Sequence, residues 1–110
     1  MTGERHPLAG LDETVHQRAR LGILAILAET READFTHLKT RLALTDGNLG
    51  RHLEVLVTAG YVTVRKGSDG RRNRTWVQIT STGRGALGKE VAMLRQLVAI
   101  AALSTPDLGA

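Results

Sequence analysis

The fold is decided by residues 44–67, which read LTDGNLGRHLEVLVTAGYVTVRKG. The first half of this stretch carries apolar residues three or four positions apart, the spacing of one helix face: Leu49, Leu53, Leu56 and Val57. Thr45 or Asp46 can cap the start of this helix, and Gly60 can adopt the left-handed conformation that often ends one. The stretch therefore predicts a capped helix that stops sharply before residue 61.

A shorter helix is expected just before it. Asp34 can cap this helix, and its apolar residues Phe35, Leu38 and Leu42 recur at helical spacing. Residues 30–33 are expected to connect it to the preceding helix, with room for a short strand pairing. Only a turn of about three residues separates the two short helices, which is the pattern of a helix-turn-helix.

Two alternating segments follow, over residues 61–66 and 75–80. Between them, Gly67-Ser68-Asp69-Gly70 includes an Asp-Gly pair, a strong signal for a tight reversal. The strand residues expected to share the inner faces are Val62, Val64, Val77 and Ile79. The order helix, helix, helix, strand, strand predicts a winged helix-turn-helix, mainly α with a small β-hairpin.

Both terminal helices carry more apolar surface than one small domain can cover. The first is expected from Asp12 to about Glu29, and the last from residues 80–82 to about Leu103. Between residues 91 and 103 only two side chains are polar. We therefore expect the terminal helices to form a homodimer, the alternative being a monomer with a tightly wrapped last helix. The predicted dimer contacts are Val15, Leu24, Val91, Leu94, Val98 and Ala101.

The length of 110 residues suits one domain. We expect a flexible arm over residues 1–10, a domain over 11–104 that includes a C-terminal dimerisation helix at about 81–103, and a tail over 105–110. No signal-peptide pattern is present, and the apolar stretches fall short of the ~20 residues that span a bilayer, so a cytoplasmic protein is expected. The absence of cysteine excludes disulfides, thiolate metal sites and a cysteine nucleophile.

The positive charge is concentrated in one window. Residues 48–74 hold six basic side chains against two acidic ones, so they account for the whole net charge of +4. Such a patch on an otherwise balanced chain is typical of a surface that binds a polyanion. The alternative is a hairpin whose arginines only keep it soluble.

The outward face of the helix after Thr45 is slim and polar. Asn48 offers the donor and acceptor that match an adenine edge, and Arg51 offers the fork that matches guanine or a phosphate. Thr45 and the first free amides of the helix can hold a phosphate. Glycine within a helix costs about 0.8–1 kcal/mol relative to alanine. Gly47 and Gly50 therefore indicate either close approach to DNA or tight packing against the second helix.

The hairpin adds arginines that can enter a minor groove or straddle phosphates. Trp76, the only tryptophan, is expected to pack against a helix rather than to stack on a base. Double-stranded DNA is the predicted partner. The predicted DNA contacts are Thr45, Asp46, Gly47, Asn48, Gly50, Arg51, Arg65, Lys66, Arg71, Arg72, Asn73 and Arg74.

These segments, together with RRNRTWVQITSTGRGAL at residues 71–87, resemble winged-helix transcriptional regulators related to the MarR and ArsR families. The similarity is greatest to a short single-domain branch with a TDGNL-type recognition turn. It implies a homodimer that binds a pseudo-palindromic operator, often as a repressor. It also places Thr45, Asp46, Asn48, Gly50 and Arg51 in the DNA-reading turn and helix, and Arg71, Arg72 and Arg74 in the wing. Many relatives have serine in place of Gly50, so one hydroxyl contact is missing here.

Other chemistry finds little support in the sequence. Glu13 and His16 share a helix face, but two ligands do not complete a zinc site, so no metal or other cofactor is expected. No P-loop, nucleophile elbow or paired-carboxylate site is present, so we do not expect an enzyme. The sequence leaves open whether a small-molecule effector binds. Its expected binding site is a dimer cleft between the first and last helices. The alternative function is a winged-helix module for protein–protein interaction without specific DNA binding.

Overall fold

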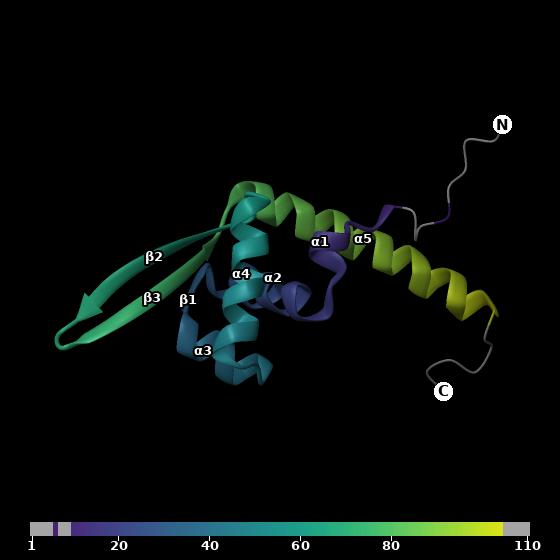
Figure 1. Cartoon of the computed structure of the whole chain (residues 1–110). Helices are drawn as coiled ribbons and strands as arrows, with labels where there is room; N and C mark the ends of the chain where they lie inside the picture. The colour runs from purple at the N-terminus through teal and green to yellow at the C-terminus, as the bar shows by residue number, and fades with distance from the viewer. Residues whose placement is uncertain (1–5, 7–9, 105–110) are drawn as a thin grey trace.

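The computed structural model describes residue 6 and residues 10–104, so most of the expected arm and all of the expected tail lie outside the described residues. The chain is a mainly helical winged helix with a small antiparallel sheet, as predicted. Its body is helical, the hairpin projects from one side, and the last helix extends toward the other (Figure 1). The elements are α1 (Glu13–His16), α2 (Arg18–Thr30), β1 (Glu32–Asp34), α3 (Phe35–Leu42), α4 (Asp46–Thr58), β2 (Val62–Asp69), β3 (Arg72–Ile79) and α5 (Ser81–Ser104).

The N-terminal helix is broken, which corrects the prediction of one continuous helix. Asp12, where the first helix is expected to start, caps α1 by accepting from the amide of Thr14 at 2.9 Å. Gln17 then adopts an extended conformation, with φ −61° and ψ 132°. Its side-chain oxygen accepts from the amide of Arg20 at 2.9 Å and caps α2. The second cap satisfies an amide that the break leaves without a helical partner.

The helix-turn-helix is built from the predicted caps. Asp34 accepts from the amide of His37 at 2.7 Å, and Thr45 accepts from the amide of Asn48 at 3.1 Å. Thr45 rather than Asp46 is therefore the cap of α4. Gly60, with φ 81°, follows the end of α4 in the left-handed region, as predicted.

The sheet has the strand order β1-β3-β2, and both pairings are antiparallel. The short strand pairing expected near residues 30–33 is β1, which lies beside β3 with Ala33 opposite Val77. The hairpin is longer than predicted, because its ladder continues to Asp69 opposite Arg72. Only Gly70 and Arg71 form the turn, and Gly70 has the positive φ of 66° that a two-residue reversal favours.

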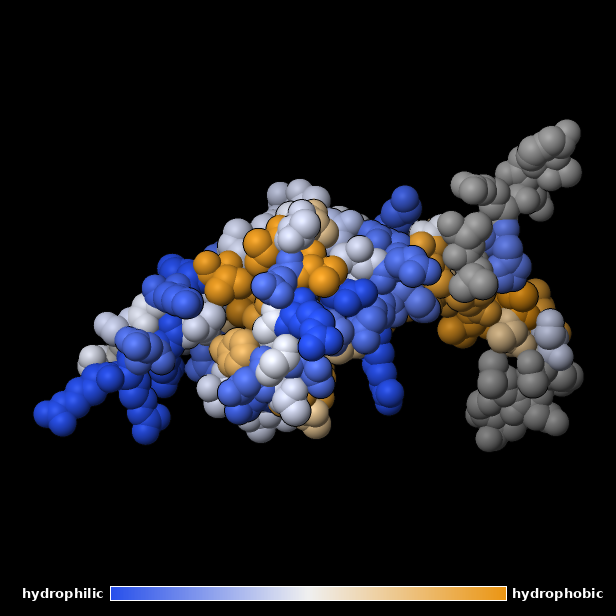
Figure 2. All heavy atoms as spheres, in the orientation of Figure 1, coloured by the Kyte–Doolittle hydropathy of each residue, from blue (hydrophilic) through white to orange (hydrophobic). Residues whose placement is uncertain are grey.

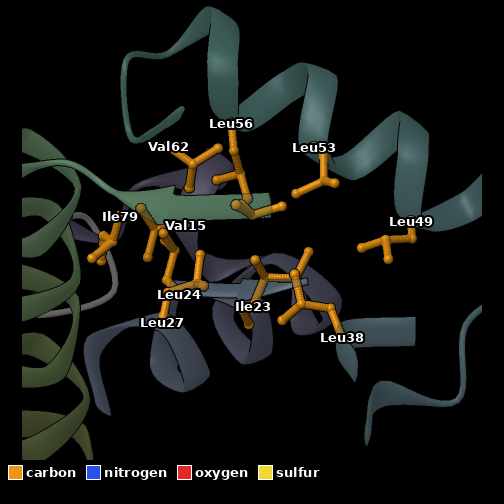
Figure 3. Close-up of a cluster of buried hydrophobic side chains, with 12 residues drawn as sticks. Val15, Ile23, Leu24, Leu27, Leu38, Leu49, Leu53, Leu56, Val62 and Ile79 are labelled. Carbon is orange, nitrogen blue, oxygen red and sulfur yellow. The ribbon is translucent and has the colours of Figure 1, made fainter. Parts of the chain in front are cut away.

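The core lies where α2, α3 and α4 meet the inner part of the sheet (Figure 3). Val62, Val77 and Ile79 are buried in it, as expected. Val64 is 40% exposed, which corrects its predicted inward position. The hairpin projects from the helical body, so the helices cover less of its outer part (Figure 1). The helical residues of the core include Val15, Ile23, Leu24, Leu27, Leu38, Leu49, Leu53 and Leu56.

The long helix α5 is anchored at its start and exposed at its end. The Thr80 hydroxyl accepts from the amide of Gly83 at 2.9 Å and donates to the carbonyl of Gly60 at 2.7 Å. Near the other end, Val98 is 62% exposed and Leu103 is 88% exposed. This apolar surface appears in orange at the far end of the helix (Figure 2). The expectation that the domain cannot cover its last helix is confirmed.

Two predicted dimer contacts do not reach the surface. Val15 and Leu24 are fully buried inside the chain itself, so their assignment to a dimer interface is wrong. The apolar stripe of the N-terminal helices serves the domain's own core. Val91 and Leu94 are partly buried, whereas Val98 and Ala101 are exposed on α5. Among the described residues, no helix is long and apolar enough to cross a membrane.

Candidate nucleic-acid interface

The outward face of α4 is open at both of its glycines. A Cβ built on Gly47 or Gly50 meets no described atom within 4 Å. Packing against α3 therefore does not explain these glycines, although each costs about 0.8–1 kcal/mol of helix stability relative to alanine. Asn48 and Arg51 are exposed beside them. The helix backbone is therefore openly accessible on this face.

A groove of about 780 Å³ separates α4 from the hairpin. Gly47, Gly50 and Arg51 line it on the helix side, and Lys66 lines it on the strand side. Val64 lies in the same groove, which accounts for the exposure of this valine. The groove thus brings three of the predicted helix residues and one predicted hairpin cation to a common surface, whereas Thr45, Asp46 and Asn48 do not line it.

The start of α4 carries an ion pair that the sequence did not reveal. Lys39 Nζ of α3 lies 2.9 Å from Asp46 Oδ1 in the first turn of α4. The Asp46 side chain is 75% exposed, so this pair adds little to stability. Its consequence is electrostatic, because Lys39 offsets the negative charge of a carboxylate at the start of α4.

The tip of the hairpin projects from the helical body (Figure 1), and Arg72 and Asn73 line a hollow with residues 34–37. Arg71, Arg72 and Asn73 are exposed there. Figure 2 shows strongly hydrophilic side chains at the end of this projection, far from the apolar end of α5. The hairpin tip therefore carries exposed positive charge at the far end of the projection.

At the base of the hairpin, two arginines form ion pairs with carboxylates of β1. Arg65 Nη2 lies 3.1 Å from Glu32 Oε2, and Arg74 Nη1 lies 3.6 Å from Asp34 Oδ2. Both guanidinium carbons also lie within 6 Å of the Trp76 ring centroid, at 5.9 and 5.7 Å. Trp76 is thus a platform for cations at this position. Arg65 and Arg74 fasten the hairpin to β1, which the sequence did not reveal.

The side chain of His52 on α4 contacts the side chain of Arg20 on α2. Arg20 Nη1 lies 3.2 Å from His52 Nδ1, and Arg20 Nε donates to the carbonyl of Thr14 at 2.7 Å. Burial and the neighbouring Arg20 and Arg51 lower the pKa of His52. The contact with Arg20 gives His52 a hydrogen-bonding role within the domain.

The segment around α1 contacts both Tyr61, which follows α4, and Glu90 of α5. Tyr61 donates its hydroxyl to Asp12 Oδ2 at 2.7 Å, and this hydrogen bond, with burial, raises the pKa of Tyr61. His16 Nδ1 lies 2.6 Å from Oε2 of Glu90, which is buried on α5. Within the described part of the chain, no group of three or more His, Asp and Glu side chains could hold a metal ion.

Comparison with known proteins agrees with this arrangement. An uncharacterized protein of Methanocaldococcus jannaschii is 38% identical over 78 residues, which cover 71% of this chain and 85% of that protein. A transcriptional regulator homologue from Pyrococcus horikoshii has a TM-score of 0.75 and 32% identity, and the match covers 80% of this chain and 87% of that one.

Two bacterial regulators share the fold. The regulator MosR of M. tuberculosis, solved in complex with DNA, has a TM-score of 0.66 and 28% identity over 86% of this chain and 67% of that one. A MarR-family regulator from Rhodococcus has a TM-score of 0.66 and 17% identity over 93% of this chain and 74% of that one. A family model described as the winged helix DNA-binding domain matches residues 19–98. The chain therefore belongs to the winged helix DNA-binding domain family.

Proposed function

We propose that this chain is a transcriptional regulator that binds specific double-stranded DNA sites as a homodimer. The observation that carries the proposal is the open face of α4, where Gly47 and Gly50 give up helix stability and meet no described atom. A helix with such a face can approach base edges in the major groove closely. Membership of the DNA-binding family and the DNA complex of the similar MosR support it.

We assign base reading to α4 and backbone contacts to the hairpin. Asn48 and Arg51 are exposed on the helix face and carry the donors and acceptors that match adenine and guanine. Arg71, Arg72 and Asn73 at the hairpin tip fit the phosphates or the minor groove beside the site. Thr45, at the cap of α4, stands where a phosphate can meet the first amides of the helix.

The homodimer is proposed from the apolar end of α5. Val98, Ile100 and Leu103 are 62%, 43% and 88% exposed. Pairing with a second copy would cover this surface and would set two α4 helices about one DNA turn, roughly 34 Å, apart. Such a dimer reads a palindromic site. Bound across a promoter, it would exclude the polymerase and so act as a repressor.

Selection from a pool of random duplexes, followed by a salt titration on the enriched site, tests the proposal. We expect a palindrome with half-sites about one turn apart and an affinity that falls steeply with salt. Arg51→Ala should weaken the specific site by about 1–3 kcal/mol, with less effect on random DNA. The double variant Arg71→Ala, Arg72→Ala should weaken all sequences alike and flatten the salt dependence.

Two results would contradict the proposal. If no sequence is enriched and binding is weak and strongly salt-sensitive, the basic surface attracts DNA only through charge, and a protein-interaction module becomes the better reading. If both variants weaken specific and random DNA equally, the division between α4 and the hairpin is wrong. Transcription in vitro from a promoter that contains the site then tests repression, which we expect to grow with occupancy of the site.

A further inference from the structure

Arg20, a residue of α2, contacts both α1 and α4. Its Nε donates to the carbonyl of Thr14 at 2.7 Å, and its Nη2 donates to the carbonyl of Glu13 at 3.4 Å. Its Nη1 lies 3.2 Å from Nδ1 of His52 in α4. One guanidinium therefore joins two carbonyls of α1 to a ring on α4, across 32 residues of sequence. Arginine suits this role because its donors are fixed in a planar fork.

The contact decides which nitrogen of His52 carries the proton. A guanidinium has donors and no acceptor, so Nδ1 of His52 must be the acceptor and must be unprotonated. The neutral ring then carries its proton on Nε2. A proton on Nδ1 would remove the acceptor and would place two cations against each other.

The charged groups around the ring also favour its neutral form. Burial lowers the pKa of His52, and Arg20 from α2 and Arg51 from α4 lower it further. From α1, Glu13 offers Arg20 its backbone carbonyl, and the side chain of His16 pairs with Glu90 of α5. His52 therefore stands beside two cations, and Arg20 reaches it while anchored on α1.

His52 directly follows Arg51, which we assign to base reading, and directly precedes Leu53, which is buried in the core. We propose that Arg20 is a positioning residue for DNA reading, which holds α4 against α1 through the neutral form of His52 and releases it when His52 is protonated. This inference rests on the proposed DNA binding. Arg20 would act by fixing the rotation of α4 about its axis, and hence the direction of Arg51.

The first test needs no DNA. Nitrogen NMR shifts of the histidine rings in the full chain report the tautomer of each ring. We expect His52 near neutral pH in the form protonated at Nε2 only, and we expect Arg20→Gln to shift this ring toward the mixture of tautomers found in water. A ring protonated at Nδ1 in the unaltered chain would overturn the proposal.

The second test measures affinity for the selected site against pH. His52→Asn keeps an acceptor near the place of Nδ1 and does not titrate. Between pH 7.5 and 5.5, the affinity of the unaltered chain should fall relative to His52→Asn by less than about tenfold. Tenfold is the limit for a histidine with the ordinary pKa of 6.5, and the pKa of His52 is lowered. His37→Asn is the comparison variant: it removes a different exposed histidine, on α3, and the fall relative to His52→Asn should persist in it.

The sign of this difference separates positioning from simple charge. If acid raises the affinity of the unaltered chain relative to His52→Asn, then His52 acts as one more cation toward phosphate, and the proposal is wrong. Arg20→Lys keeps the charge but cannot reproduce the three contacts, so it should lose affinity while staying folded. Full affinity in Arg20→Lys would also overturn the proposal. If the unaltered chain binds no duplex at all, the proposed function fails, whereas the ring shifts still decide the Arg20–His52 geometry.

Discussion

A side chain on Gly83 would overlap the carbonyl oxygen of Tyr61. A Cβ built on Gly83 falls on this oxygen, which itself accepts from the amide of Thr80 at 3.0 Å. The first turn of α5 thus lies directly on the chain that leaves α4. Glycine is needed here for close approach, since Gly83 is not among the residues with positive φ.

Gly83→Ala should therefore destabilise the protein by about 1–3 kcal/mol or more, the usual cost of forcing extra volume into a packed site. Gly85→Ala, two residues later in the same helix, meets no described atom within 4 Å and should stabilise by up to about 1 kcal/mol. Urea unfolding of both variants measures the difference. Equal stability of the two variants would show that α5 can move away from Tyr61 at no cost.

The glycines of α4 should show opposite effects on stability and on binding. Gly47→Ala and Gly50→Ala fill open space, so each should raise the free energy of unfolding by about 0.5–1 kcal/mol. Each added methyl group should keep the helix from the DNA and weaken the specific complex. Unfolding and DNA affinity are measured on the same preparations, with Gly85→Ala as the control for helix propensity alone. Unchanged affinity in both variants would mean that the helix does not approach DNA along this face.

The pair of His16 and Glu90 should show strong coupling. The Glu90 side chain is fully buried, its Oε2 lies 2.6 Å from His16, and its Oε1 has no hydrogen-bond partner among the described residues. His16→Ala would leave the carboxyl group buried without any side-chain partner, at a cost of about 1–3 kcal/mol. In the background of Glu90→Gln the same change should cost less, because an amide carries no charge. A double-mutant cycle measured by urea unfolding tests this, and strictly additive effects would contradict it.

Stability should depend on pH through His52. The lowered pKa means that the folded chain binds fewer protons at His52 than the unfolded chain does, for which the ordinary value is 6.5. Linkage then makes the free energy of unfolding decrease as pH falls below about 6.5, with the full value present above it. The difference between the unaltered chain and His52→Asn isolates this contribution from other groups. An unaltered chain that gains stability relative to His52→Asn on acidification would reverse the assigned direction.

The exposed end of α5 should control self-association. Val98→Glu places a charge on the surface that we assign to the dimer, so it should weaken association by roughly tenfold or more. Gln96→Glu adds the same charge to an exposed position about 200° around the helix and should have little effect. Sedimentation equilibrium measures both. A dimer equally strong in both variants would place the interface elsewhere.

Much of the fold could be predicted because its signals are local. The caps Asp12, Asp34 and Thr45 each accept from an amide two or three residues later, and Gly60 follows the end of its helix with positive φ. These interactions depend on residues within one helical turn, so the sequence alone contains them. The exposed glycine face of α4 could be predicted for the same reason, since the spacing of its leucines determines which side is inward.

The contacts of the hairpin base could not be predicted. The sequence does not distinguish Arg65 and Arg74 from Arg71 and Arg72. Among the described residues, Arg65 and Arg74 are the ones that form ion pairs with β1. Their partners lie more than 30 residues earlier in the chain, and no spacing rule connects them. The ladder that brings β1 beside β3 decides which arginines meet the carboxylates of β1.

The sequence by itself determined the order of the helices and strands, the caps of the helix-turn-helix and the positive charge of one surface. The tertiary structure decided which apolar residues are covered, because burial depends on what packs against a helix and not on the composition of the helix. Val15 and Leu24 are therefore enclosed by their own domain, whereas Val98 and Leu103 have no covering element in the described chain. The same packing joins Arg20 to His52, two residues whose meeting only the folded chain can arrange.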